Sequence, residues 1–165
     1  EWLKDLERER GWEHPIEIME NLFFCPRGSS VDLSDGRRVL FAGGADSIDK
    51  QWRDAGVNWF PQETMKYSDY ARIDFTKKYD IVVSHTCPLN CMGWMKEVYR
   101  GVSQKSFDLT SDLLQSIFDR VRPKKWFFGH WHVDKMLWED KYALYHDVYL
   151  IDEEIKCIEY IEYEY

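Results

Sequence analysis

Two short apolar runs in this chain each end at histidine, and this arrangement limits the folds that the chain can adopt. Residues 81–84 lead into His85, and residues 125–128 lead through Gly129 into His130 and His132. Short apolar runs of this kind favour buried strands. In layered α/β folds, ligand groups gather beyond the carboxyl ends of strands. The pattern therefore predicts an α/β protein with imidazoles at one sheet edge.

These imidazoles are candidate metal ligands. His130 and His132 lie two residues apart, so on a continued strand both would point to one side. In a loop just past the strand they could equally reach two neighbouring ions. Neutral imidazole is a common ligand of zinc, manganese and iron. A lone His85 is ordinarily a structural residue and an H-x-H pair alone is a moderate signal, but together they favour metal binding by His85, His130 and His132.

Apolar residues at helical spacing predict two main helices. The first occupies the start of the chain and ends near Gly11. The second covers residues 109–121, with Thr110 or Ser111 as the expected N-cap. A shorter helix near 63–75 is expected within an otherwise irregular, charged and aromatic part of the chain.

Turn residues between apolar runs predict a hairpin and further strands. Asp35-Gly36 separates residues 31–33 from residues 38–42, which is the pattern of a tight hairpin turn. Further strands are expected in the apolar or alternating stretches near 133–138, 142–150 and 154–162. No internal repeat or low-complexity linker occurs, so we expect a single domain over residues 1–165.

Composition and charge argue against several function classes. The formal net charge is −8, and no run of Lys and Arg is longer than two residues. Duplex nucleic acid is therefore disfavoured as the main ligand, because its binding usually needs a basic stripe. No apolar run reaches membrane-spanning length and no signal-peptide pattern opens the sequence. Free thiols in a cytoplasmic protein are the simplest interpretation of the four cysteines, Cys25, Cys87, Cys91 and Cys157.

The sequence around the histidines resembles the calcineurin-like metallophosphoesterases. FGHWH at residues 128–132 is similar to the terminal G-H-x-H motif of that family, and DIVVSHTCP at residues 80–88 resembles the strand-to-histidine motif before it. GGADSIDK at residues 43–50, followed by Arg53 and by WFPQE at residues 59–63, is similar to a stretch found in a bacterial and phage branch. The resemblance covers roughly residues 20 to 138, and its motifs are specific for the family but not for a substrate.

This resemblance implies a fold, an activity and a set of ligands. The implied fold is a four-layer α/β/β/α sandwich. His85 and His130 would ligate one divalent ion and His132 a second, with Mn²⁺ favoured and Fe, Zn or Ni as alternatives. The implied activity is hydrolysis of a phosphoric ester in a phosphoprotein, nucleotide or small metabolite, through a water that two ions activate. Arg53 is a candidate contact for the substrate phosphate, although a surface salt bridge is at least as good an interpretation.

Other motifs of the family do not occur in the chain. Its remaining ligands come from an N-terminal D-x-H, a G-D-x-x-D and a G-N-H-[DE], and the last also supplies the histidine that protonates the leaving group. The sequence contains none of these, so no catalytic residue is assigned. We expect Glu1 to lie just after G-N-H-[DE], with the N-terminal strands missing from this chain and the segment inactive alone.

Two other interpretations stay open. A phosphoesterase-like domain that has lost catalysis would serve as a binding or scaffold module, and the absent front motifs favour this. An unrelated zinc protein would require His130 and His132 to share one ion with a cysteine or carboxylate. His146 follows Tyr145 in a strand-like stretch, and we interpret it as structural.

Overall fold

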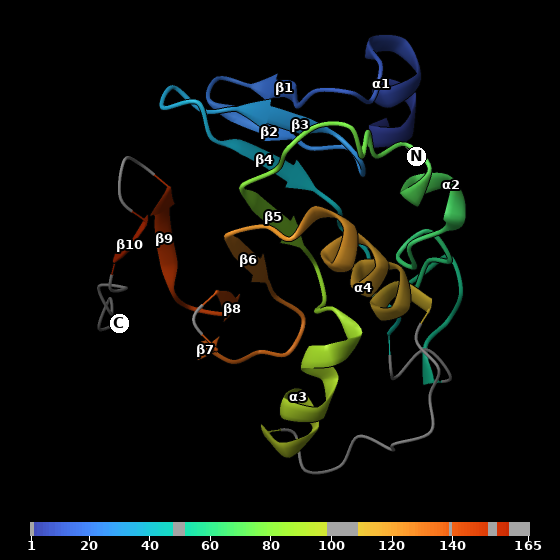
Figure 1. Cartoon of the computed structure of the whole chain (residues 1–165). Coiled ribbons are helices and arrows are strands. Elements are labelled where there is room, and N and C mark those ends of the chain that lie inside the picture. The colour runs from blue at the N-terminus through green and yellow to red at the C-terminus, as the bar shows by residue number, and fades with distance from the viewer. Residues whose placement is uncertain (1, 48–51, 99–108, 139, 152–154, 159–165) are drawn as a thin grey trace, which may run out of the picture.

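The chain folds as a mixed α/β protein built around one sheet (Figure 1). This computed structural model describes residues 2–47, 52–98, 109–138, 140–151 and 155–158. The main sheet has six strands in the order β3-β4-β5-β6-β8-β7. Their bounds are β3 (Ser30–Asp32), β4 (Arg38–Phe41), β5 (Ile81–Ser84), β6 (Lys125–Phe128), β8 (Lys141–Ala143) and β7 (Lys135–Leu137).

The four central strands are parallel, and this brings their carboxyl ends to one edge. β4, β5, β6 and β8 pair in parallel, whereas β3 and β7 close the two sides as antiparallel strands. Ser84 at the end of β5 is the register partner of Phe128 at the end of β6. The segments that follow these two strands therefore begin side by side. The strands predicted at residues 81–84 and 125–128 are confirmed.

Helices cover one face of this sheet. α4 (Leu109–Val121) lies across β5 and β6 in Figure 1, and α3 (Met92–Val98) follows a short 3-10 turn at Leu89–Cys91. Strand residues that alternate toward the helices join side chains of α3 and α4 in the larger core cluster. Its most buried large members are Trp126, Phe128, Leu40, Met95, Leu114 and Ile117.

The predicted helix over residues 109–121 is confirmed, but its predicted cap is wrong. The helix begins at Leu109, so Thr110 and Ser111 both lie within its first turn. Both are fully buried, and the Thr110 hydroxyl accepts a hydrogen bond of 3.0 Å from the Met65 amide. This tertiary contact, rather than helix capping, explains the hydroxyl at residue 110.

The opposite face of the sheet carries a second, smaller apolar cluster. Its buried members come from four adjacent strands, namely Val39, Ile81, Phe127 and Tyr142. Half-buried apolar side chains surround them, and these are Val31, Leu33, Phe41, Val83, Leu144, Tyr149 and Ile151. Within the described part of the chain, no helix packs in this cluster, so the two faces of the sheet are covered very differently.

The N-terminal segment forms a helix and a separate hairpin beside the sheet. α1 (Trp2–Arg10) is followed directly by Gly11, which has φ +84°, so the predicted end of the helix near Gly11 is confirmed. β1 (Ile16–Met19) and β2 (Leu22–Phe24) pair antiparallel. The β3–β4 hairpin has its turn at Asp35-Gly36, where Gly36 has φ +83°, and this prediction is also confirmed. The short helix expected near 63–75 is α2 (Tyr67–Tyr70).

The C-terminal part differs from the prediction in one respect. The expected strand over 142–150 is two strands in different sheets, β8 of the main sheet and β9 (Val148–Ile151). The chain turns between them because Asp134 binds the amides of residues 145–147. β9 pairs with β10 (Ile155–Ile158), which lies in the stretch expected at 154–162, and residues 159–162 fall outside the described part. Among the described residues, no helix has the length and apolar character needed to span a membrane.

Candidate metal centre

The structure brings the rings of His85 and His130 together at the sheet edge. The amide of Gly129 donates a hydrogen bond of 3.0 Å to the His85 carbonyl, so the parallel pairing of β5 and β6 continues one step past the strands. The ring centroids of His85 and His130 are 5.1 Å apart at an interplanar angle of 68°. Two segments separated by about forty residues thus place two imidazoles side by side.

This spacing suits two nitrogen ligands of one ion. Metal-to-nitrogen bonds of about 2.0–2.1 Å place two imidazoles that share a tetrahedral ion with their ring centroids about 5 Å apart. His85 and His130 match that separation. Across the described residues, however, no three side chains of His, Cys, Asp or Glu are grouped so that they could hold an ion. The pair can supply two ligands, and a complete coordination shell needs more.

The loop that carries His130 and His132 has an unusual backbone that a buried tryptophan holds in place. His130 has φ +72° and His132 has φ +50°, a region that residues other than glycine seldom adopt. Trp131 between them is 5% exposed, and its indole Nε1 donates a hydrogen bond of 3.2 Å to Thr86 Oγ1. This backbone conformation places the Trp131 side chain in the core. The hydrogen bond from Trp131 links this loop to Thr86, the residue after His85.

His132 lies against a different set of side chains. Its ring stacks on Tyr145, with centroids 4.9 Å apart and an interplanar angle of 20°. Tyr145 in turn contacts the His146 ring at 4.1 Å. Asp134 accepts hydrogen bonds from the amides of Tyr145 (2.6 Å), His146 (3.0 Å) and Asp147 (2.9 Å), and lies 3.2 Å from His146 Nδ1. The carboxylate therefore positions the loop that supports His132.

His146 is consequently closer to the candidate site than the sequence indicated. It was predicted to be structural and without relation to the other three histidines. In the structure it does have a structural role, since Asp134 and Tyr145 hold it. Tyr145 nevertheless links its ring to that of His132. His146 is exposed and forms an ion pair with Asp134 when it is protonated.

The environment of His85 favours its neutral form. Although His85 is exposed to solvent at the sheet edge, partial desolvation of its imidazole is the largest cause that lowers its pKa below the usual value. The negative charge of Glu63 opposes this shift, while the positive charges of Arg27 and His132 add to it. A neutral imidazole is the form that a metal ion binds.

Arg53, the predicted phosphate contact, makes a local hydrogen bond. Its guanidinium donates a hydrogen bond of 3.1 Å to the carbonyl of Asn58, in an exposed turn. Arg27, for which no role was predicted, carries a positive charge that contributes to lowering the pKa of His85. It lies between Pro26 and Gly28, residues that are typical of a turn. No local pattern distinguishes this arginine, because its partners lie more than thirty residues away.

Among the described residues, no cysteine belongs to a group of three or more side chains that could hold a metal ion. Cys87 and Cys91 are fully buried, and Cys87 Sγ contacts Met92 Sδ at 3.7 Å in the core beneath α3. The hydrogen bond with Cys91, together with burial, raises the pKa of the Cys87 thiol. Cys25, Cys87 and Cys91 are free thiols, as predicted. The side chain of Cys157 lies outside the described residues.

Residues and geometry alone define this candidate centre. Two imidazoles lie at the carboxyl ends of adjacent parallel strands, a third is stacked on Tyr145 close by, and Asp134 and Trp131 hold the supporting loops. No protein-family model matches the chain, and no curated protein matches it either.

Proposed function

We propose that this chain carries the histidine part of a metal centre in a phosphoric-ester hydrolase of the calcineurin-like metallophosphoesterase type. The observation that carries this proposal is the 5.1 Å separation of the His85 and His130 rings at the ends of two parallel strands. That spacing matches two ligands of one ion. The order of elements along the chain also agrees with the family's motifs: a strand, a histidine, a helix, a second strand and then Gly-His-x-His.

Each histidine has a separate role in this proposal. His85 and His130 hold one divalent ion, and His132 contributes to a second, with Mn²⁺ favoured over Fe, Zn or Ni. Such ions would supply positive charge to a phosphoryl group and make a bound water acidic. The lowered pKa of His85 favours the neutral imidazole, which is the form that binds a cation. Tyr145 fixes the plane of the His132 ring by stacking.

The proposal extends to the architecture. The six-stranded sheet has helices on one face and half-buried apolar side chains on the other. A second sheet packed on the apolar face, with its own helices outside, would produce the four-layer α/β/β/α sandwich. Aligned sheets bury such faces against one another. Carboxylates from that second sheet would complete the coordination that the histidines begin.

The alternative is a phosphoesterase-like module that binds a partner without catalysis. One observation favours it, namely that the described residues contain no complete group of metal ligands. The two functions differ in what they require of the histidines. A scaffold has no need for a pair of imidazoles at ligand spacing, whereas a hydrolase depends on it.

Metal binding by the purified chain tests the proposal most directly. We expect isothermal titration to show saturable Mn²⁺ binding that H85A or H130A weakens at least tenfold, because each removes one of the two closest ligands. H14A is the matched control, since His14 is exposed and lies between α1 and β1 rather than at the end of β5 or β6. It removes one imidazole and should change Mn²⁺ affinity less than twofold. Equal loss in H14A and H130A would contradict the proposed site.

Hydrolysis of an aryl phosphate with and without Mn²⁺ provides the second measurement. We expect only slow turnover by this chain, because it lacks the carboxylate motifs that share the ions. Any turnover should require Mn²⁺ and should disappear in H130A. Turnover that persists in chelator, or that H130A leaves unchanged, would contradict a metal-dependent hydrolase.

A further inference from the structure

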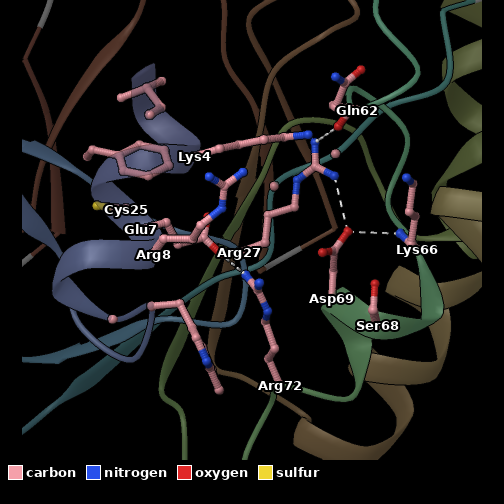
Figure 2. Close-up of a pocket in the computed structure, with 16 residues that line it drawn as sticks. Lys4, Glu7, Arg8, Cys25, Arg27, Gln62, Lys66, Ser68, Asp69 and Arg72 are labelled. Atoms are coloured by element: carbon pink, nitrogen blue, oxygen red, sulfur yellow. Dashed lines mark hydrogen bonds and ion pairs between the residues drawn. The ribbon is translucent and has the colours of Figure 1, made fainter. Parts of the chain in front are cut away.

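A basic cavity lies beside the histidine edge, although the protein as a whole is acidic. Its volume is about 850 Å³, and it is enclosed by α1, the Cys25–Arg27 segment, Gly43-Gly44 and residues 62–72 (Figure 2). Five basic side chains line it, from Lys4, Arg8, Arg27, Lys66 and Arg72, against two acidic ones. The net charge of the chain is −8. A local excess of positive charge on such a protein is the electrostatic signature of an anion site.

Three of the five basic groups have acidic partners. Arg72 forms an ion pair with Glu7, Arg8 pairs with Asp5 at 2.9 Å, and Arg27 pairs with Asp69 at 3.2 Å. Lys4 and Lys66 have no acidic partner among the described residues, and both are exposed to solvent. Two ammonium groups therefore remain available to a ligand.

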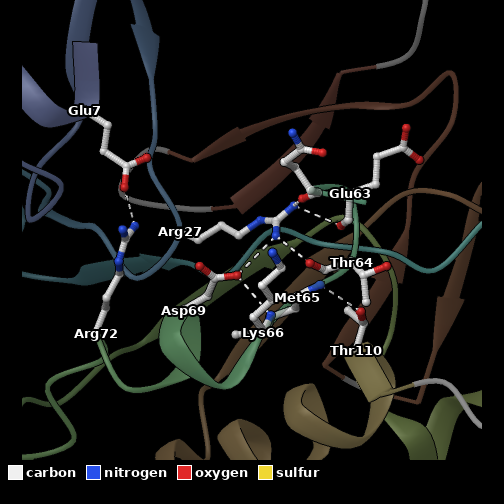
Figure 3. Close-up of polar contacts among 10 residues, drawn as sticks. Glu7, Arg27, Glu63, Thr64, Met65, Lys66, Asp69, Arg72 and Thr110 are labelled. Carbon is white, nitrogen blue, oxygen red and sulfur yellow. Dashed lines mark hydrogen bonds and ion pairs between the residues drawn. The ribbon is translucent and has the colours of Figure 1, made fainter. Parts of the chain in front are cut away.

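Arg27 gives the cavity a rigid, charged floor. One terminal nitrogen donates to the Thr64 carbonyl at 3.0 Å and to Asp69, and the other donates to the carbonyls of Gln62 (2.7 Å) and Glu63 (2.9 Å), as Figure 3 shows. Three of these four acceptors are uncharged carbonyls, so only Asp69 offsets the guanidinium charge. Its position is fixed by contacts across the fold, and a ligand would meet a group that is already ordered.

The Gly43-Gly44 pair adds backbone donors to the wall. Both glycines have positive φ, +63° and +76°, and an added Cβ would meet Arg27 Cγ at 3.0 Å and Met65 Cβ at 2.9 Å, respectively. Within the described residues, neither amide donates a hydrogen bond. Successive N–H groups in left-handed backbone form concave anion sites in many proteins. Glycine is needed here because no side chain fits the space.

Two aromatic side chains also line the cavity. Trp12 and Phe24 both contribute to its wall, and the Arg72 guanidinium lies 5.2 Å from the centre of the Trp12 ring. Flat heterocycles stack favourably on aromatic rings of this kind. The cavity thus combines basic and aromatic side chains, and its volume is within the usual range for small-molecule pockets.

We propose that this basic cavity binds a nucleoside di- or triphosphate. The phosphates contact Lys4, Lys66 and the Gly43-Gly44 amides, and the base lies against Trp12. The site does not require metal ions at the histidine edge. The two regions adjoin, because the Thr86 amide donates a hydrogen bond of 3.2 Å to the Gly44 carbonyl. A nucleotide bound here would be either the substrate of that edge or a ligand that acts on it from the adjoining cavity.

Titration of ATP into the chain in EDTA tests this proposal without any metal. We expect saturable one-to-one binding that is at least tenfold tighter than binding of AMP, because AMP has fewer charges to meet the lysines. The double variant K4Q/K66Q should weaken ATP binding at least tenfold, and K4R/K66R should restore it. The control is K78Q/K135Q, which removes the same charge from exposed lysines outside the cavity and should change affinity less than twofold.

Two further measurements make the outcome decisive. Inorganic tripolyphosphate should bind more weakly than ATP because it has no base to contact Trp12, and equal affinity would overturn the nucleoside assignment. No saturable ATP binding, or equal loss in K78Q/K135Q, would overturn the anion site itself. H130A should lower Mn²⁺ binding and leave ATP binding in EDTA unchanged, so failure of the cavity and failure of the metal centre can be told apart.

Discussion

The indole of Trp131 donates a hydrogen bond of 3.2 Å to the hydroxyl of Thr86, and this contact joins the two loops that carry the candidate metal ligands. Both residues are buried, at 5% and 1% exposure. Trp131 separates His130 from His132, and Thr86 follows His85 directly. The distance between the imidazoles is therefore set in part by a bond between two residues that are not themselves ligands.

The two partners of this bond should be energetically coupled. We expect T86V to lower the free energy of unfolding by about 1–3 kcal/mol, because it removes the hydroxyl that accepts the hydrogen bond of the buried indole. W131F removes the donor and some packing. The double variant should lose less than the sum of the two single losses, as measured by urea denaturation. Strict additivity would mean that the hydrogen bond is absent in solution.

Asp134 should stabilise the loop that supports His132. D134A removes the acceptor of three backbone amides at residues 145–147, and we expect a loss of about 1–3 kcal/mol in denaturant unfolding. Hydrogen exchange of these amides should accelerate in the variant. D147A is the control, because it removes a carboxylate from the same loop while its backbone amide still binds Asp134. Unchanged exchange in D134A would contradict this role.

The chain should lose stability in acid through Asp80. Burial alone would raise the pKa of this carboxyl, but its hydrogen bonds and ion pairs with Lys124, the Arg38 amide and Lys78 outweigh burial and lower it. A lowered folded-state pKa stabilises the protein fully above the unfolded value of about 3.9, and that contribution is lost as pH falls through the folded value.

The measurement is the difference in unfolding free energy between wild type and D80N as a function of pH. We expect a difference of about 1–2 kcal/mol at pH 7 that shrinks below pH 4, because wild-type Asp80 is then protonated too. D54N, at an exposed carboxylate, provides the charge-matched control. A D80N difference that stays constant down to pH 2 would rule out this titration.

Gly44 should tolerate no side chain. Its φ is +76°, and an added Cβ would lie 2.9 Å from the Met65 Cβ, so G44A combines backbone strain with a steric clash. We expect a loss of about 2–4 kcal/mol by thermal or denaturant unfolding. Gly36 has φ +83° but nothing within 4 Å of an added Cβ. G36A therefore introduces backbone strain without a steric clash, and it should lower the free energy of unfolding by only about 1 kcal/mol. Equal losses would show that the Met65 contact relaxes freely.

Local sequence patterns predicted the elements that hold the histidines. The strands at residues 81–84 and 125–128 were predicted with the bounds found in the structure, and the helix over 109–121 was predicted correctly except for its cap. Their periodicity is a property of consecutive residues, so it can be recognised without the fold. The carboxyl-end position of His85 and His130 follows from the same runs, because parallel strands end at one edge.

Local patterns were therefore sufficient to predict the strands at residues 81–84 and 125–128, the main helix and the two imidazoles at the sheet edge. Features that depend on residues far apart in the chain became visible only in the folded protein. Thr110 looked like a helix cap and instead binds the amide of Met65, 45 residues away. Arg27 lay in an ordinary turn segment, yet its four acceptors lie 35 to 42 residues further on. Periodicity reports local conformation, whereas the partners of a buried polar group are fixed by how the chain packs.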